Sequence, residues 1–233
     1  MSVRLAQGDS TANLTFPMAK MQVEIWSDVA CPFCWIGKTS FDRAFERFDH
    51  ADETEVVWRS YQLGPGMPRE IEGDIYDVLA AKYGGTREDA KKMNGRVAAM
   101  AEQVGLDCDF DAIRPTNTLD AHRVIHFARP LGKEGEVNER LFEAYFHDGS
   151  NVSDIGVLRR AGADAGLDPE AVGEMLESGD YSIAVQAEQE QAHELGISAV
   201  PTFVFDRASA VQGAQSEDLL LQALETAWAA QER

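Results

Sequence analysis

The chain contains 233 residues, of which 44% are hydrophobic and 26% charged, a composition typical of one or two ordinary globular domains. Its 40 acidic residues against 21 lysines and arginines leave a formal charge of −19, which repels phosphate backbones and anionic lipid headgroups, so we expect binding to neither nucleic acids nor membranes. No apolar run approaches the roughly 20 residues that cross a bilayer, and the first residues lack the apolar segment of a secretory signal. The sequence therefore predicts a cytoplasmic protein.

The first predicted elements carry the main motif of the chain. Residues 1–20 are polar and aperiodic, which predicts a disordered extension. Residues 21–27 alternate between apolar and polar side chains, as a strand does. A helical pattern then follows Cys31, in which Pro32 suits the first helical position and Cys31 the N-cap.

Helical patterns dominate the middle of the chain. Aromatic and β-branched residues at 56–61 predict a second strand, which ends at a segment rich in proline and glycine. The elements predicted after it are helices capped by Thr86, Asn117 and Asp168, a helix at 181–195, strands at 202–205 and 210–211, and a final helix capped by Ser216. This order predicts an α/β fold in which residues 21–64 and 180–233 form one domain, interrupted by a helical insertion at 65–179.

Cys31 and Cys34 form a C-x-x-C motif between a predicted strand and a predicted helix. Free N–H groups and the helix dipole at such a position stabilise a thiolate, and can lower the pKa of a cysteine from about 8.5 to roughly 3.5–7.5. The second thiol lies one turn further on, within reach to attack a mixed disulfide. The motif therefore predicts dithiol redox chemistry in which Cys31 attacks and Cys34 resolves.

Three alternatives to redox chemistry at this motif are a zinc site, a structural disulfide and chance. Zinc needs about four ligands, usually from paired motifs, and the chain has neither a second C-x-x-C nor paired histidines, so we predict no metal. Cys108 stands alone in a polar stretch and is interpreted as a passive thiol.

Three segments together resemble the FrnE-type branch of the DsbA-like thioredoxin superfamily. They are 26–37 (WSDVACPFCWIG), 117–123 (NTLDAHR) and 197–203 (ISAVPTF). The resemblance covers nearly all of the chain from Met21 onward. It implies a thioredoxin-like fold with a large all-helical insertion, and thiol–disulfide oxidoreductase or isomerase activity.

The resemblance also implies roles for single residues. Cys31 matches the nucleophile, Cys34 the resolving cysteine and Pro201 a cis-proline, which would leave the Val200 backbone free to pair with an extended substrate. The residues expected to contact substrate are Pro32, Phe33, Trp35, Val200, Pro201 and Thr202. Protein or peptide thiols and disulfides are the implied partners, with glutathione as a further co-substrate, for a monomer or homodimer that needs no cofactor besides its dithiol.

The sequence departs from the secreted members of the superfamily at two points. Phe33 replaces the histidine that makes those enzymes strong oxidants, and the secretory signal is missing. Both departures predict a reduction potential inside the range of roughly −270 to −120 mV, with the direction of catalysis left open.

A second resemblance implies a different activity. Kappa-class glutathione transferases and hydroxychromene-carboxylate isomerases share the D-V-x-x-P-x-x-W framework and the proline loop, but typically carry serine where Cys31 stands. They imply a glutathione-dependent isomerase or transferase that acts on a small aromatic substrate.

Three charged residues near the motif have competing interpretations. Glu24 on the first strand could move protons for Cys34 if it is buried, although an exposed edge glutamate is commoner. Asp28 is either a turn residue or a second proton-transfer group. Lys38 lies one turn beyond Cys34, and a solvated lysine is the expected state.

Polar residues farther along the chain are candidates for substrate contacts. Asn117 either caps its helix or, with His122, contacts a substrate. Gln215 and Ser216 begin the last helix, whose N–H groups could hold a carboxylate of glutathione. Capping by Ser216 is the simpler interpretation.

Overall fold

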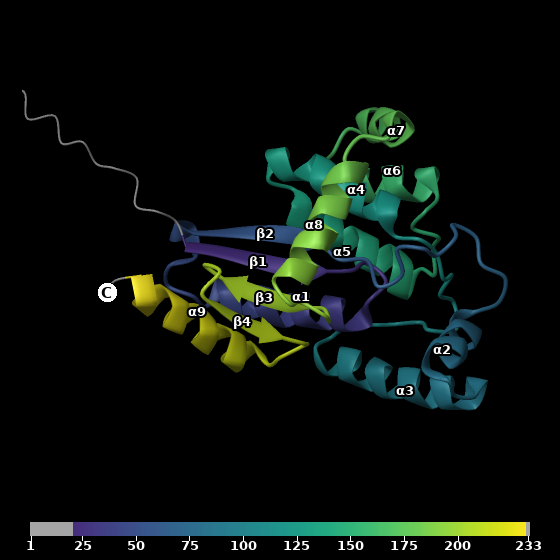
Figure 1. The fold of residues 1–233 in the computed structure, drawn as a ribbon, viewed down its shortest axis with the longest axis horizontal. Coiled ribbons are helices and arrows are strands. Elements are labelled where there is room, and N and C mark those ends of the chain that lie inside the picture. The colour runs from purple at the N-terminus through teal and green to yellow at the C-terminus, as the bar shows by residue number, and fades with distance from the viewer. Residues whose placement is uncertain (1–20, 232–233) are drawn as a thin grey trace, which may run out of the picture.

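The computed structural model describes residues 21–231, so the extension predicted at 1–20 lies outside the described residues. The described strands form one mixed sheet in the order β2-β1-β3-β4 (Figure 1). They are β1 (Met21–Ser27), β2 (Thr54–Ser60), β3 (Thr202–Phe205) and β4 (Ser209–Gln212). β1 pairs parallel with β2 and antiparallel with β3, which pairs antiparallel with β4. The predicted α/β class and the predicted strands are confirmed.

The helices fall into two groups, those that cover the sheet and those inserted between β2 and α8. The first group is α1 (Pro32–Glu46), α8 (Ser182–Glu194) and α9 (Glu217–Gln231). The inserted helices are α2 (Ile75–Tyr83), α3 (Arg87–Gln103), α4 (Leu119–Ala128), α5 (Glu134–Phe142), α6 (Ile155–Asp164) and α7 (Pro169–Ser178), with 3₁₀ turns at Ala51–Glu53 and Arg129–Leu131 and a π-helical turn at Glu143–His147. No helix within residues 21–231 is long and apolar enough to cross a bilayer.

The two faces of the sheet bury different chemistry, because successive residues of a strand point to opposite sides. On one face Ile25 pairs with Phe203, whose ring stacks on Phe41 of α1 at a centroid distance of 5.4 Å. On the other face Glu24 and Arg59 form an ion pair beneath α8, which crosses β1 and β2 in Figure 1. The first face is an apolar core, and the second holds a buried ionic network.

Carboxylates from the helices close the outer edge of β2. The N–H groups of an edge strand that face away from its neighbour are left without a strand partner. Glu134 of α5 accepts a hydrogen bond from the Trp58 amide at 2.8 Å, and Glu188 of α8 accepts one from the Ser60 amide at 2.7 Å. These bonds attach the inserted helices and α8 to the sheet.

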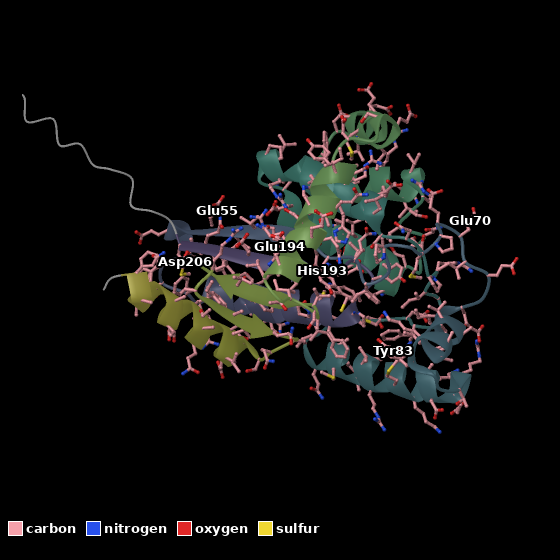
Figure 2. All side chains as sticks on the ribbon, viewed as in Figure 1. Glu55, Glu70, Tyr83, His193, Glu194 and Asp206 are labelled. Carbon is pink, nitrogen blue, oxygen red and sulfur yellow. The ribbon has the colours of Figure 1, made fainter. Side chains whose placement is uncertain are left out.

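The negative charge of the chain is distributed over its outer surface. Glu55 on β2, Glu70 in the loop before α2 and Glu194 on α8 are all exposed, and in Figure 2 Glu70 lies on the opposite side of the molecule from Glu55. The acidic residues therefore do not gather on a single element.

Helix α1 comes closest to the segment before β3 at Gly37. A Cβ atom built on Gly37 would lie 2.8 Å from Cγ of Pro201 and 3.4 Å from Cζ of Phe203. Helix α1, which begins directly after Cys31 and contains Cys34, can approach Pro201 this closely because residue 37 has no side chain.

Replacement of Gly37 by alanine is expected to lower the free energy of unfolding by about 1–3 kcal/mol, because the added methyl group must push Pro201 away from α1. Urea denaturation measures this. Gly95 is a matched control inside α3, since a Cβ there meets nothing within 4 Å, and Gly95→Ala should raise stability by up to about 1 kcal/mol. Equal effects of the two substitutions would contradict the close contact.

Candidate active site

The two cysteines lie at the start of α1, directly after β1 and a tight turn. The Asp28 carbonyl accepts a hydrogen bond from the Cys31 amide at 3.0 Å, and Pro32 takes the first helical position. Cys31 is the N-cap residue in an extended conformation, and the Cys34 amide donates to its carbonyl at 2.9 Å. Both thiols are free and buried. The predicted strand, turn and helix are thus confirmed around the motif.

The environments of the two thiols differ. Burial raises the pKa of Cys34 well above its ordinary value, and the neighbouring Cys31 thiol adds to this effect. The Ser27 hydroxyl and the Asp28 backbone act in the opposite direction without cancelling it. Cys34 therefore keeps its proton at neutral pH, while Cys31 stands at the end of the helix where the dipole favours an anion. This asymmetry favours Cys31 as the attacking group.

The loop before β3 lies against Cys31. The peptide bond between Val200 and Pro201 is cis, and the Cys31 thiol donates to the Val200 carbonyl at a sulfur–oxygen distance of 3.6 Å. The Thr202 hydroxyl donates to the Ala199 carbonyl at 2.8 Å and so closes the loop. The structure thus brings Val200 and Pro201 to the thiol, as expected from the resemblance.

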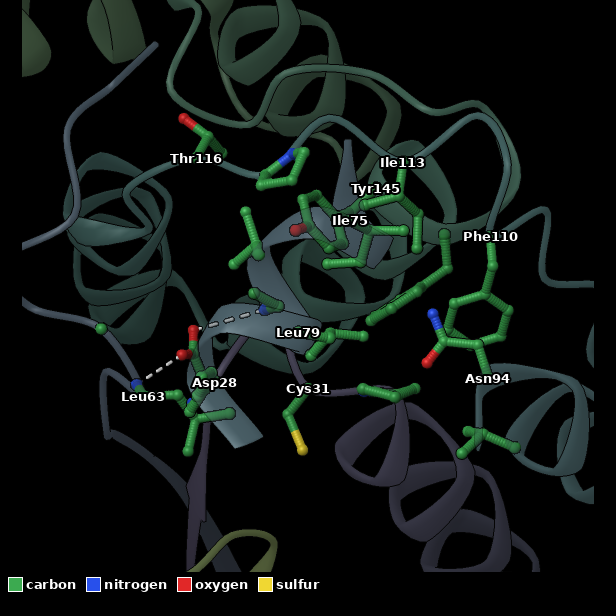
Figure 3. Close-up of a pocket in the computed structure, with 18 of the residues that line it drawn as sticks. Asp28, Cys31, Leu63, Ile75, Leu79, Asn94, Phe110, Ile113, Thr116 and Tyr145 are labelled. Carbon is green, nitrogen blue, oxygen red and sulfur yellow. Dashed lines mark hydrogen bonds between the residues drawn. The ribbon is translucent and has the colours of Figure 1, made fainter. Parts of the chain in front are cut away.

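Asp28 is completely enclosed next to the dithiol and organises its surroundings. Its carboxylate accepts a hydrogen bond from the Leu63 amide at 2.7 Å (Figure 3). It also accepts one from the Ala30 amide at 3.3 Å and lies 3.4 Å from Nε2 of His122. Burial would raise the pKa of Asp28, but the bonds from His122 and the Leu63 amide hold it below its ordinary value. These contacts make Asp28 an ionised anchor between the turn, the loop after β2 and α4.

Glu24 is buried on an interior strand, so the commoner expectation of an exposed edge glutamate is wrong. Its carboxylate bonds Arg59 at 2.6 Å and Arg207 at 2.7 Å. Burial raises the pKa of Glu24, but the two guanidinium groups lower it below its ordinary value overall. The groups that shift the pKa of Cys34 are Cys31, Ser27 and Asp28, which leaves proton transfer by Glu24 without a contact to support it.

The expectations for Trp35 and Lys38 need correction. Trp35 does not face a substrate, because it is buried and stacks on Phe146 with ring centroids 5.9 Å apart. Lys38 is buried rather than solvated, since its ammonium bonds Asp42 at 2.6 Å and Glu139 at 2.8 Å. Glu139 also accepts a hydrogen bond from the Trp35 indole at 2.9 Å, so both side chains fix α1 to α5.

The remaining candidates have local structural partners. The N-cap of α4 is Thr118 rather than Asn117. The side-chain oxygen of Asn117 nevertheless accepts a hydrogen bond from the Leu119 amide, and its side-chain nitrogen donates one to the Met67 carbonyl. Gln215 donates to the carbonyl of Gln212. Ser216 accepts a bond from the Leu219 amide at 3.4 Å, as a cap does.

Cys108 lies outside the site. Burial, with the charge of Asp107, raises the pKa of the half-buried Cys108 thiol to about 11.

A cavity of about 220 Å³ opens beside the dithiol, and no sequence pattern indicated it (Figure 3). Cys31, Pro32 and Phe33 lie at one end of it. Apolar side chains of the inserted region supply most of the wall, among them Ile75 and Leu79 of α2, Val97 of α3, and Phe110 and Ile113 of the loop between α3 and α4. Each has the spacing of an ordinary core residue, so only the tertiary structure reveals that together they leave a space.

The described part of the chain contains no group of three or more histidine, cysteine, aspartate or glutamate side chains that could hold a metal ion.

Known proteins resemble this chain in sequence and in fold over most of its length. Residues 22–225 match the DSBA-like thioredoxin domain family. The uncharacterized protein YwbO of Bacillus subtilis is 29% identical over 206 residues, which are 88% of this chain and 96% of that protein. A probable DsbA oxidoreductase from Streptomyces coelicolor is 37% identical with a TM-score of 0.84, and the match covers 90% of each chain.

A more distant structure shares the fold alone. The cytosolic disulfide reductase DsbM from Pseudomonas aeruginosa, solved with GSH, is 18% identical with a TM-score of 0.65. The match covers 88% of this chain and 98% of that one.

Proposed function

We propose that this chain, which belongs to the DSBA-like thioredoxin domain family, is a thiol–disulfide oxidoreductase of the FrnE type that works through the Cys31–Cys34 pair. The observation that carries the proposal is the placement of both free thiols at the start of α1, with Cys31 against the Val200 carbonyl. Disulfide exchange needs a reactive first thiol, a second thiol close enough to attack the mixed disulfide and a surface that holds the substrate strand.

In the reducing direction, the Cys31 thiolate attacks one sulfur of a substrate disulfide and releases the other as a thiolate. Cys34 then attacks the Cys31 sulfur, which frees the second substrate thiolate and leaves a Cys31–Cys34 disulfide. The Cys34 proton passes to a departing thiolate, and two electrons move from the dithiol to the substrate. In the oxidising direction the same bonds form and break in reverse order. In isomerisation a different thiolate of the substrate, rather than Cys34, displaces Cys31 from the mixed disulfide, so the dithiol is regenerated and no net electrons move.

We place the protein in the cytoplasm with protein or peptide disulfides as substrates and glutathione as a co-substrate. The support is the likeness of its fold to a cytosolic disulfide reductase that was solved with GSH. Pro32 and Phe33 lie at the cavity beside Cys31, and Phe33 is partly exposed there, as expected of residues that contact a substrate.

The equilibrium reduction potential of the Cys31–Cys34 pair tests this function. Thiol trapping in glutathione buffers, followed by mass spectrometry, should find one intramolecular disulfide with a potential between about −270 and −120 mV. Cys108→Ser is the control and should leave the potential unchanged, because Cys108 takes no part in the pair. A Cys31 that stays reduced, or that forms only a stable glutathione adduct, would refute the proposal.

A second candidate function is a glutathione-dependent isomerase or transferase for a small aromatic substrate. The apolar cavity beside Cys31 favours it, because its size suits an aromatic ring. Binding to a glutathione resin, together with isomerase or transferase activity that survives Cys34→Ser, would favour this alternative over the oxidoreductase.

A further inference from the structure

Asn94 is an unpaired polar residue in the wall of the cavity beside the dithiol. It lies in the middle of α3, only 4% of its surface is exposed, and its Nδ2 atom has no hydrogen-bond partner among the described residues. Buried amide groups in proteins almost always have a partner, so an orphaned one needs an explanation. Figure 3 shows its side chain directed into the space bounded by Leu79, Phe110 and Ile113.

The space around Asn94 fits one ring-sized group. Its volume is about 220 Å³, whereas a dry engineered cavity of about 150 Å³ already binds benzene. Most of the surrounding side chains are apolar, so an occupant must be mainly apolar with a polar group at one point. Asp28 and Lys82 are the charged residues of the wall; Asp28 is buried and Lys82 is exposed, so inside the cavity the nearby charge is negative and disfavours an acidic occupant.

The cavity extends to the proposed nucleophile, since Cys31 forms part of its wall. A substrate that becomes disulfide-bonded to Cys31 is held at this end of the cavity. The residue next to its reactive cysteine is then the group within reach of the cavity interior.

We propose that Asn94 determines substrate specificity by pairing with the hydroxyl of a tyrosine that flanks the substrate's reactive cysteine. The inference rests on the proposed oxidoreductase function. A phenol ring matches the apolar wall, and its hydroxyl can both accept from and donate to a carboxamide. Phenylalanine would fill the same space but would leave the Asn94 amide unpaired, and sites built around a hydrogen bond reject such analogues strongly.

The test compares two peptide disulfides, the dimers of N-acetyl-Tyr-Cys-amide and N-acetyl-Phe-Cys-amide, in single turnovers with the reduced protein. Each turnover yields two peptide thiols and the Cys31–Cys34 disulfide, so no recycling partner is needed. The wild type should reduce the tyrosine dimer about tenfold faster or more. Asn94→Leu should reverse the order, whereas Gln103→Leu, at an exposed position of the same helix, should leave it unchanged.

A binding measurement tests recognition of a phenol by Asn94 separately from the oxidoreductase function, because binding does not depend on redox activity. Thermal shifts with p-cresol and toluene should favour p-cresol for the wild type and toluene for Asn94→Leu. Absence of peptide reduction with the p-cresol preference intact would contradict the oxidoreductase function and, with it, the role of Asn94 in substrate specificity, and would leave only a phenol-binding site at Asn94. Equal response of the wild type to both compounds, or equal loss of both peptide rates in Asn94→Leu, would refute the role of Asn94.

Discussion

The Cys31→Ser variant is expected to lose disulfide reductase activity by at least about a thousandfold, because a serine hydroxyl cannot take part in disulfide exchange and Cys34 cannot replace it. Burial raises the pKa of Cys34 well above its ordinary value, so Cys34 lacks the thiolate that attack on a substrate disulfide requires. Insulin reduction with dithiothreitol as the final reductant measures the loss. Wild-type turnover by the Cys31→Ser variant would contradict the proposed mechanism.

The Cys34→Ser variant provides the matched contrast. Its Cys31 should still attack the first substrate, but without the second thiol the mixed disulfide should persist and be visible by non-reducing electrophoresis. The two variants together assign the attacking and resolving roles. A mixed disulfide trapped on Cys34 in Cys31→Ser, with none on Cys31 in Cys34→Ser, would reverse the assignment.

The motif and its immediate frame could be predicted from the sequence because the signals are local. Pro32 fixes the first helical turn, the preceding alternation fixes β1, and both lie within a dozen residues of Cys31. The cis-proline loop is far from the motif in sequence, and its place beside Cys31 followed from a family resemblance rather than from local pattern.

The environments of the charged side chains could not be predicted, since their partners lie far away in the sequence. Lys38 is buried because Glu139 reaches it from α5, and Glu24 is buried because Arg207 reaches it from the turn after β3. Nothing in the sequence near Lys38 or Glu24 indicates these contacts. The cavity escaped prediction for the same reason, as Asn94 and Phe110 meet only after the inserted helices pack.

Removal of Glu188 is expected to cause a large loss of stability, because four groups share its carboxylate. Its carboxylate accepts the Ser60 amide at 2.7 Å and bonds Arg59 at 2.8 Å, Arg129 at 3.0 Å and His126 at 3.1 Å. In Glu188→Ala all four groups lose this carboxylate as an acceptor while they remain mostly buried. We therefore expect the substitution to lower the free energy of unfolding by about 3–5 kcal/mol. Urea denaturation of both proteins at pH 7 measures the difference.

The pH dependence of that difference follows from the lowered pKa of Glu188. Burial would raise this pKa, but the bond from His126, the charges of His126 and Arg129 and the Ser60 amide bring it far below its ordinary value. The contribution of a carboxylate with a depressed pKa is complete above its unfolded pKa of about 4.3 and declines as the pH falls toward the folded value.

The gap in unfolding free energy between wild type and Glu188→Ala should therefore stay constant above about pH 5.5 and narrow steadily below about pH 4. Glu190→Ala, exposed on the same helix, should change stability by no more than about 0.5 kcal/mol throughout. A gap that widens on acidification would show that Glu188 is protonated in the folded protein, which would contradict the ionic attachment of α8 to β2.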